Sequence, residues 1–216
     1  MPTYFPDPAI MATFAVAALV LAITPGPDMA LFISRTISFG TRHGLATVAG
    51  AITGITVHTL LVAFGISVLI LTAPAAFMAL KMAGALYLLW LAIDALRSGG
   101  GLTVTRSHRG KPPSLLGSYL KGLGINLTNP KVALFFVTFL PQFVSPADPN
   151  ASGKLIFLGL EFVVVSLPVV FAIVFSARWL TATLAGSPVV QKALNWSFAA
   201  VFAAFAVTIL TAEARR

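Results

Sequence analysis

The sequence predicts an all-α integral membrane protein with six transmembrane helices, arranged as two inverted three-helix repeats whose first helices are broken. Three observations support this fold class. The chain of 216 residues is 58% hydrophobic and only 9% charged, with a mean hydropathy of +0.95, whereas soluble domains carry about 25% charged residues. Its apolar residues come in blocks of the length that crosses a bilayer, which is about 20 residues. Two of these blocks contain proline breaks at corresponding positions.

Six apolar blocks follow one another along the chain when it is read in windows of about 19 residues. They cover residues 9–33, 44–71, 74–96, 116–140, 155–175 and 194–211. They predict a single membrane domain over residues 1–216, with a first repeat at about 8–97, a cytoplasmic loop at about 98–115 and a second repeat at about 116–212. No basic segment precedes the first block, so it is not predicted to be a cleaved signal peptide.

The breaks in the first and fourth blocks have similar sequences. The segment PDMALF, which begins at Pro27, and the segment PKVALF, which begins at Pro130, differ only at their second and third positions. Each stands at the break of the first helix in a set of three. Because three is odd, the second set enters the membrane from the opposite side, which makes the two halves inverted repeats. Interrupted helices at matching positions of such halves indicate a binding site near the middle of the bilayer.

The distribution of Lys and Arg predicts the orientation, because cytoplasmic loops carry the excess of both. With the N-terminus outside, the inner side holds Arg35, Arg42, Arg97, Arg106, Arg109, Lys111, Arg178 and Lys192, and the outer side holds Lys81, Lys154, Arg215 and Arg216. Lys121 and Lys131 fall within the fourth block and are not counted. We therefore expect both termini on the outer side.

The broken helices are the predicted substrate site. A proline removes one amide donor from a helix, and lipid offers no water to the groups that are freed. Each break must therefore line a cavity or be buried in protein, where freed carbonyl groups and the N-terminus of a half-helix can bind a polar ligand. Either break alone is also compatible with a simple proline kink. The predicted substrate-binding residues are Thr24, Pro25, Gly26, Pro27, Asp28, Asn126, Asn129, Pro130 and Lys131.

Asp28 and Lys131 occupy the same place in the two halves. A charge at the centre of a membrane helix costs about 2.5 to 3.5 kcal/mol, so each should face a cavity or a partner. One hypothesis is a clamp for a zwitterion, in which Asp28 binds an ammonium group and Lys131 binds a carboxylate. The alternatives are a salt bridge that joins the halves, or a lysine that extends to the membrane surface. Asn126 and Asn129 share one helix face and either line the path or join helices.

Three residues are candidates for proton coupling: Asp28, Glu161 and His58. Each lies within an apolar block and can bind a proton during a transport cycle. For His58 the alternative is a histidine that serves as a packed hydrogen-bond partner. Glycine pairs with four-residue spacing, Gly40 with Gly44 and Gly50 with Gly54, predict close packing of the second helix.

Several classes of function are excluded or disfavoured. The chain has no cysteine, so thiol chemistry and disulfides are excluded. It has neither a GxxxxGK[ST] phosphate loop nor an HExxH motif, so we expect no ATP hydrolysis, no metal catalysis and no cofactor. The net charge of +8 lies mostly between apolar blocks without a basic stripe, which argues against a nucleic-acid partner.

Longer motifs resemble the LysE/RhtB family of bacterial amino-acid exporters. They are ITPGPDMALFISRTISFGTRHGLATVAGAITG, HTLLVAFGISVLI, KMAGALYLLWLAIDALRS and GLGINLTNPKVALFFVTFLPQFV, and they cover residues from Thr24 to about Val144. The resemblance implies a multi-pass protein of the bacterial cytoplasmic (inner) membrane, with periplasmic termini under the orientation above. It also implies export of amino acids or close derivatives driven by the proton motive force, with functional weight on Pro25, Gly26, Pro27, Asn129 and Pro130.

The expected function is therefore secondary active export of a small amino-acid substrate, with the lipid bilayer as the protein's environment. The alternative transporter is a cation or metal exporter of related architecture, which would need more carboxylates or imidazoles at the site. A membrane-embedded enzyme would need a paired catalytic set that the sequence does not contain, and a structural subunit has no use for matched breaks of opposite charge. The sequence leaves open the substrate, the coupling ion and whether the protein forms a homo-oligomer.

Overall fold

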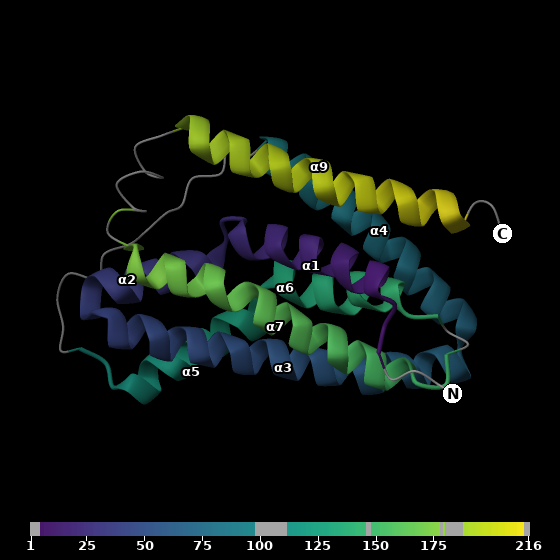
Figure 1. Ribbon diagram of the computed structural model, residues 1–216, viewed down its shortest axis with the longest axis horizontal. Coiled ribbons are helices and arrows are strands. Elements are labelled where there is room, and N and C mark those ends of the chain that lie inside the picture. Colours follow the sequence, from purple (N-terminus) through teal and green to yellow (C-terminus); the bar gives the residue numbers. More distant parts are fainter. Residues whose placement is uncertain (1–4, 98–111, 146–147, 178, 180–187, 214–216) are drawn as a thin grey trace.

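A computed structural model describes residues 5–97, 112–145, 148–177, 179 and 188–213. In these residues the chain is helical and contains no strand. The helices lie roughly along one direction and form a single elongated bundle (Figure 1). Each of the six predicted apolar blocks is helical, and the first and fourth are broken where the sequence predicts.

The first block forms helices α1 (Pro8–Ile23) and α2 (Pro27–Phe39), which meet at an angle of 52°. Helix α1 begins where Asp7 Oδ1 accepts a hydrogen bond from the backbone N–H of Ala9, with proline at the first helical position. It ends because the segment that follows contains two prolines, which cannot donate to the preceding turn. Helix α2 ends at Gly40, whose φ of +94° is a conformation that favours glycine.

The fourth block forms α5 (Leu115–Thr128) and α6 (Pro130–Leu134), followed by a π-helical turn (Phe135–Phe139) and a 3-10 turn (Leu140–Phe143). The bend between α5 and the segment from Pro130 to Phe143 is 54°. Asn129 ends α5 and also caps α6, because its Oδ1 accepts from the backbone N–H of Lys131 at 3.1 Å. The two breaks therefore have nearly equal bends.

The other blocks form the continuous helices α3 (Thr41–Thr72), α4 (Pro74–Arg97), α7 (Ala151–Phe175) and α9 (Pro188–Glu213). Within α3 and α7, residues Thr41–Gly65 and Ala151–Phe175 are long and apolar enough to cross a membrane, and each bent pair also qualifies if it is counted as one span. The chain is thus a multi-pass membrane protein. The beginning of α1 and the end of α9 lie at the same end of the bundle (Figure 1).

Helix α3 packs against α5, α7 and α2, while α1 packs against α7 and α4 packs against α9. Gly50 and Gly54 make the contact with α5 very close, which confirms the tight packing predicted for the second helix. A Cβ atom on Gly50 would overlap the backbone of Tyr119, and one on Gly122 would overlap the backbone of Thr47. The prediction is wrong for Gly40, which ends α2 and has no neighbour within 4 Å of a Cβ position.

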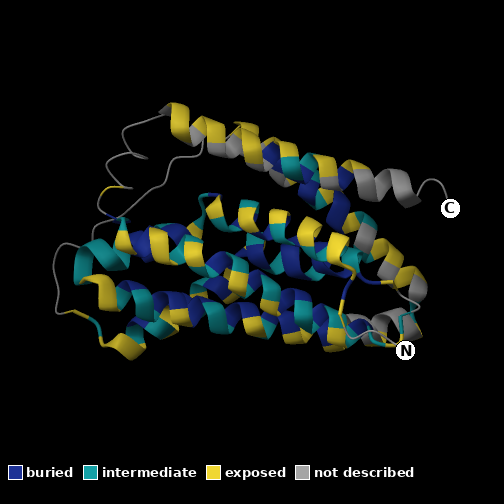
Figure 2. Ribbon diagram, viewed as in Figure 1, coloured by how far each residue is buried: buried dark blue, intermediate teal, exposed yellow. Residues whose placement is uncertain are grey.

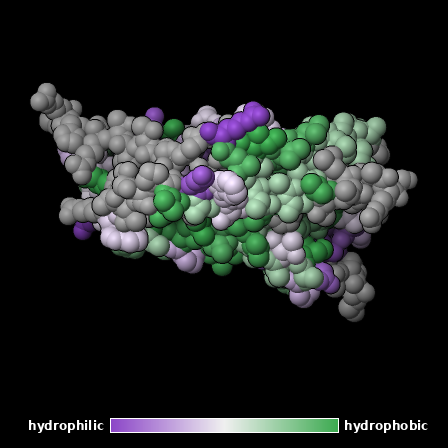
Figure 3. All heavy atoms as spheres, turned by 90° about the horizontal axis from the view of Figure 1, so that it is seen from above, coloured by the Kyte–Doolittle hydropathy of each residue, from purple (hydrophilic) through white to green (hydrophobic). Residues whose placement is uncertain are grey.

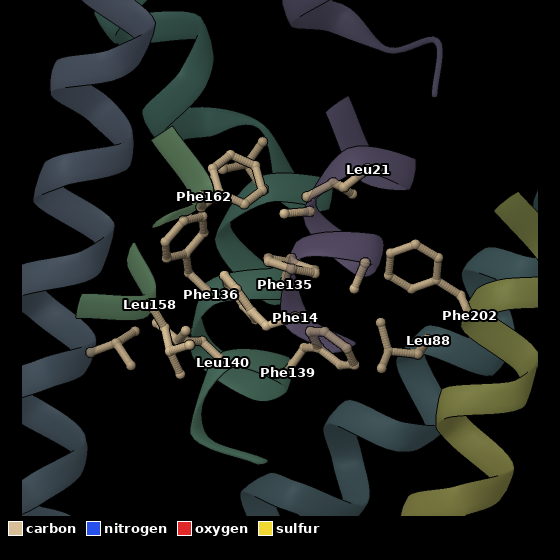
Figure 4. Packing of buried hydrophobic residues seen from close by; sticks show 14 of the residues in the cluster. Phe14, Leu21, Leu88, Phe135, Phe136, Phe139, Leu140, Leu158, Phe162 and Phe202 are labelled. Atoms are coloured by element: carbon tan, nitrogen blue, oxygen red, sulfur yellow. The ribbon is translucent and has the colours of Figure 1, made fainter. Parts of the chain in front are cut away.

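The largest core cluster is built around phenylalanines of the π-helical turn (Figure 4). Phe135 is 1% exposed and contacts the rings of Phe14, Phe162 and Phe202, which come from α1, α7 and α9. Aromatic side chains bury large areas and favour tilted or edge-to-face contacts such as these. The turn that follows the second break is thereby fixed to three other helices.

Large apolar side chains also cover the outside of the bundle. Buried residues gather between the helices and exposed ones on the outer faces (Figure 2). The exposed residues include Leu61, Val164 and Phe175, each at least 60% accessible. Hydrophobic residues cover much of the described part of the face seen in Figure 3. An apolar surface of this extent is typical of contact with lipid.

Candidate functional site

The two helix breaks lie side by side, and the second supplies a hydrogen-bond donor that the first lacks. Pro25 has no N–H, so the carbonyl oxygen of Leu21, four residues earlier, loses its helical donor. Lys131 Nζ, from the second break, donates to Leu21 O at 3.4 Å and to Thr24 O at 2.9 Å. A cation at the carbonyl end of α1 is also favoured by the helix dipole. Lys131 of the second half therefore caps the C-terminal end of α1 in the first half.

The first break in turn supplies a carboxylate to the second. Asp28 Oδ2 accepts hydrogen bonds from Asn129 Nδ2 at 2.8 Å and from Asn126 Nδ2 at 3.2 Å. The two amides come from the end of α5 and the break itself, one helical turn apart as the sequence predicts. Asp28 and Lys131 make no direct ion pair within the described part of the chain, because each charge is held by groups of the opposite half.

His58 contacts the same break from α3. Pro130 leaves the carbonyl oxygen of Asn126 without its helical donor, and that oxygen lies 3.4 Å from His58 Nε2 and accepts from the backbone N–H of Asn129 at 3.1 Å. The imidazole is 7% exposed and stacks on the ring of Phe136. This is the geometry of the alternative named for His58, a packed hydrogen-bond partner.

Two glycines make room for these polar side chains. A Cβ atom on Gly26 would lie 3.0 Å from Lys131 Nζ, and one on Gly54 would lie 2.5 Å from Asn126 Oδ1. Both distances are too short for an ordinary contact. A larger residue at either position would displace the lysine or the amide.

A cavity of about 60 Å³ opens between the two breaks and α3 and α7. This volume holds a few water molecules. The predicted residues on its wall are Thr24, Gly26, Asp28, Asn126, Asn129 and Lys131. Apolar side chains cover the rest of the wall, among them Met29, Phe32, Ile52, Phe162 and Ile173. A small number of polar groups on a mainly apolar wall is typical of a small-molecule site.

The other predicted residues do not line the cavity. Pro25, Pro27 and Pro130 shape the two breaks, and His58 lies behind Asn126. Glu161 is in α7, where its Oε2 is buried without a hydrogen-bond partner, away from the cavity wall. No group of three or more His, Asp or Glu residues that could hold a metal ion occurs in the described ranges.

Sequence reasoning missed the contribution of α7. Ser166 and Phe162 lie on the cavity wall, one helical turn apart, and Ser166 is 5% exposed. Ser166 Oγ donates to the carbonyl oxygen of Val163 at 3.1 Å. A single serine in an apolar helix with a proline two residues later carries no spacing signal, because its role depends on which face packs inward.

Comparisons with known proteins give a family and several named relatives. A family model described as LysE type translocator matches residues 19–213. An uncharacterized membrane protein of Vibrio cholerae serotype O1 is 33% identical over 209 residues, which are 96% of this chain and 100% of that protein. A homoserine/homoserine lactone efflux protein of Salmonella typhimurium is 32% identical over 202 residues, 94% of this chain and 95% of that protein. A leucine efflux protein of Enterobacter sp. (strain 638) is 29% identical over 199 residues, which are 91% of this chain and 93% of that protein. No solved structure matches the chain.

Proposed function

The chain belongs to the LysE type translocator family, and on this premise we propose that it is a secondary active exporter of amino acids or close derivatives. The observation that carries the proposal is the cavity between the two breaks, where a carboxylate, two amides and an ammonium group converge. Relatives named for efflux of homoserine, its lactone and leucine match nearly the whole chain. Membership in a family of translocators points to a transporter rather than an enzyme.

The proposed substrate site is this cavity, with Asp28 as the partner of the substrate's ammonium group. Lys131 is the partner of a carboxylate only in a state in which it releases the carbonyl groups of α1. One acid and one base at the site favour a neutral amino acid over lysine or arginine. Because about 60 Å³ holds only a few water molecules, the cavity must widen to admit such a substrate.

Widening follows if the two halves move as inverted repeats, which we include in the proposal. Three features support it. The first helices of the halves bend by 52° and 54°. Packing is reciprocal, because α3 of the first half contacts α5 while α7 of the second half contacts α1. The third helices, α4 and α9, pack on each other. In transporters with such repeats, one group of helices rocks against the other around a fixed site.

The energy source in the proposal is the proton motive force across the bacterial cytoplasmic membrane, with both termini in the periplasm. Asp28, Glu161 and His58 are the candidate proton carriers. Of these, Asp28 lies in the cavity and Glu161 has a buried oxygen without a partner. Direct competition between proton and substrate for Asp28 would give exchange of one for the other.

The deciding experiment is efflux from proteoliposomes loaded with a panel of labelled amino acids, with and without an imposed proton gradient. We expect gradient-stimulated release of a neutral subset. Liposomes that contain the Asp28→Asn variant are the control, because this change keeps the side-chain size and removes the charge. The proposal fails if folded protein releases no amino acid faster than protein-free liposomes do. Release of metal cations instead would favour a cation exporter.

A further inference from the structure

Two residues of the cavity wall each have a buried side-chain oxygen without a hydrogen-bond partner. The two atoms are Asp28 Oδ1 and Asn126 Oδ1. They flank a single hydrogen bond, in which Asn126 Nδ2 donates to Asp28 Oδ2 at 3.2 Å. A buried acceptor without a donor costs about 1–3 kcal/mol. Two such atoms, on residues that share a hydrogen bond and line one cavity, are therefore expected to receive hydrogen bonds from a ligand.

The orientation of the Asn126 amide follows from its neighbours. If the amide were reversed, its oxygen would face Asp28 Oδ2, and two acceptors would oppose each other. The nitrogen must therefore face Asp28, which leaves the oxygen free. Gly54 makes room for this oxygen, because a Cβ atom at that position would lie only 2.5 Å from it. Asn126 itself is 1% exposed, so the oxygen has no access to bulk solvent.

Each side-chain nitrogen of the described cavity wall already donates to at least one protein oxygen. The amides of Asn126 and Asn129 donate to Asp28 Oδ2, and Lys131 Nζ donates to Leu21 O and Thr24 O. None of these donors reaches Asp28 Oδ1 or Asn126 Oδ1, and one of these two free acceptors belongs to a carboxylate. A cation with several N–H groups matches this need.

We propose that Asp28 Oδ1 and Asn126 Oδ1 form a subsite for the primary ammonium group of the substrate, beside an apolar wall that holds its side chain. The subsite rests on the proposed function and names its substrate class. Recognition then depends on the N–H groups of a free amine, whereas a carboxylate has no N–H to donate to these two oxygens. Amino acids whose carboxyl group is blocked as an amide remain ligands, and amino acids with a blocked amine do not.

Three derivatives of one side chain test the subsite on the purified full-length protein in detergent. L-Leucinamide keeps the primary ammonium group and lacks the carboxylate. N-acetyl-L-leucine has the carboxylate and no ammonium group. The N,N,N-trimethyl derivative of L-leucinamide keeps the positive charge but has no N–H on that nitrogen. Leucine is chosen because its side chain is apolar, like Phe32, Ile52 and Ile173 of the cavity wall.

We expect L-leucinamide to bind at least about tenfold more tightly than either of the other two in titration calorimetry, a ratio that corresponds to about 1.4 kcal/mol. Equal binding of the trimethyl derivative would mean that charge alone is recognised and would overturn the subsite. Tighter binding of N-acetyl-L-leucine would overturn it as well. So would displacement of bound leucinamide by millimolar Na⁺, because the two oxygens would then hold a metal cation.

Variants locate the subsite. The Asn126→Ala variant removes one of the two oxygens and should weaken leucinamide binding at least about tenfold. The matched control is Leu127→Ala, since Leu127 is the next residue on α5, is 37% exposed and does not line the cavity. A folded Asn126→Ala protein with unchanged affinity would contradict the proposal. If this variant does not fold, the affinities of the three ligands for the unchanged protein still test the subsite.

The subsite and the proposed function can fail separately. If proteoliposomes export leucine and N-acetyl-L-leucine equally well, the proposed function stands and the proposed subsite is wrong. Proteoliposomes that export no amino acid would remove both.

Discussion

At the scale of single residues, the charged groups of the site form hydrogen bonds with groups of the opposite half. Lys131 donates to two carbonyl groups of the first break, and Asp28 accepts from two amides of the second. The sequence predicted that these residues lie near each other, because their positions in the repeats match. It could not predict that Lys131 binds backbone carbonyls in place of Asp28, since this depends on how the broken ends pass each other in space.

Replacing Lys131 with methionine should destabilise the protein. The change leaves Leu21 O and Thr24 O buried without the lysine donor, which costs about 1–3 kcal/mol. The expected result is a lower midpoint of thermal unfolding in detergent and slower amino-acid efflux. The control is Lys121→Met on the same block, because Lys121 is exposed. A Lys131→Met protein as stable as the parent would show that its two hydrogen bonds contribute nothing.

Replacing Asp28 with asparagine should leave the fold intact and reduce efflux at least about tenfold. The shape of the side chain is kept, but the charge that would bind an ammonium group is lost, and a charge-assisted hydrogen bond is worth about 1.5–3 kcal/mol. Initial rates of efflux from proteoliposomes measure the effect. Asp7→Asn is the charge-matched control, because Asp7 is exposed outside the cavity and asparagine caps α1 as well as aspartate does. Parent-like efflux by Asp28→Asn would exclude Asp28 from the substrate site.

At the scale of the helices, proline and glycine account for most of what the sequence predicts correctly. Proline marks both breaks because it cannot donate to the preceding turn. The spacing of Gly50 and Gly54 predicts a close helix contact, which the structure places between α3 and α5. The contribution of Ser166 on α7 was missed because a lone polar residue in an apolar helix does not reveal the face that packs inward.

The contact between α3 and α5 can be tested with two glycines of one helix. The Gly50→Val change forces side-chain atoms into the backbone of Tyr119 and should destabilise the protein by about 1–3 kcal/mol. Gly65→Val is the matched control, because a Cβ atom there meets nothing within 4 Å. Thermal unfolding of both variants in detergent measures the difference. Equal midpoints would contradict the close packing.

The turn before α7 should make stability depend on pH. Lys154 Nζ donates to Asp148 Oδ2 and the backbone N–H of Asn150 donates to Oδ1, which holds the pKa of the Asp148 carboxyl below its ordinary value of 3.8. A lowered pKa means that the carboxylate stabilises the fold above that ordinary value. The stabilisation is lost as the pH falls through the lowered pKa.

We therefore expect Asp148→Asn to lower the unfolding midpoint at neutral pH and to have little effect once the carboxyl is protonated. A series of thermal unfolding curves from neutral to strongly acidic pH measures this difference. A variant that is destabilised equally at both ends of the series would show that the charge of Asp148 is not the cause.

At the scale of the whole molecule, the orientation in the membrane is open to a direct test. The beginning of α1 and the junction of α2 with α3 lie at opposite ends of the bundle (Figure 1). Because the chain has no cysteine, single cysteines report one position each. We expect a membrane-impermeant maleimide to label Phe5→Cys in intact cells and to label Thr41→Cys only after the cells are opened. The opposite pattern would place both termini in the cytoplasm.

Because the hydrogen bonds join the two breaks, the order of synthesis limits when they can form. The first half leaves the ribosome before α5 and α6 exist, so during that interval neither Lys131 nor the two asparagines have been synthesised. The carbonyl group of Leu21 and the carboxylate of Asp28 must then remain in contact with water or with the insertion machinery. We therefore expect the first helix pair to reach its final position only after the second pair has been inserted, because α5 and α6 provide the hydrogen bonds that complete it.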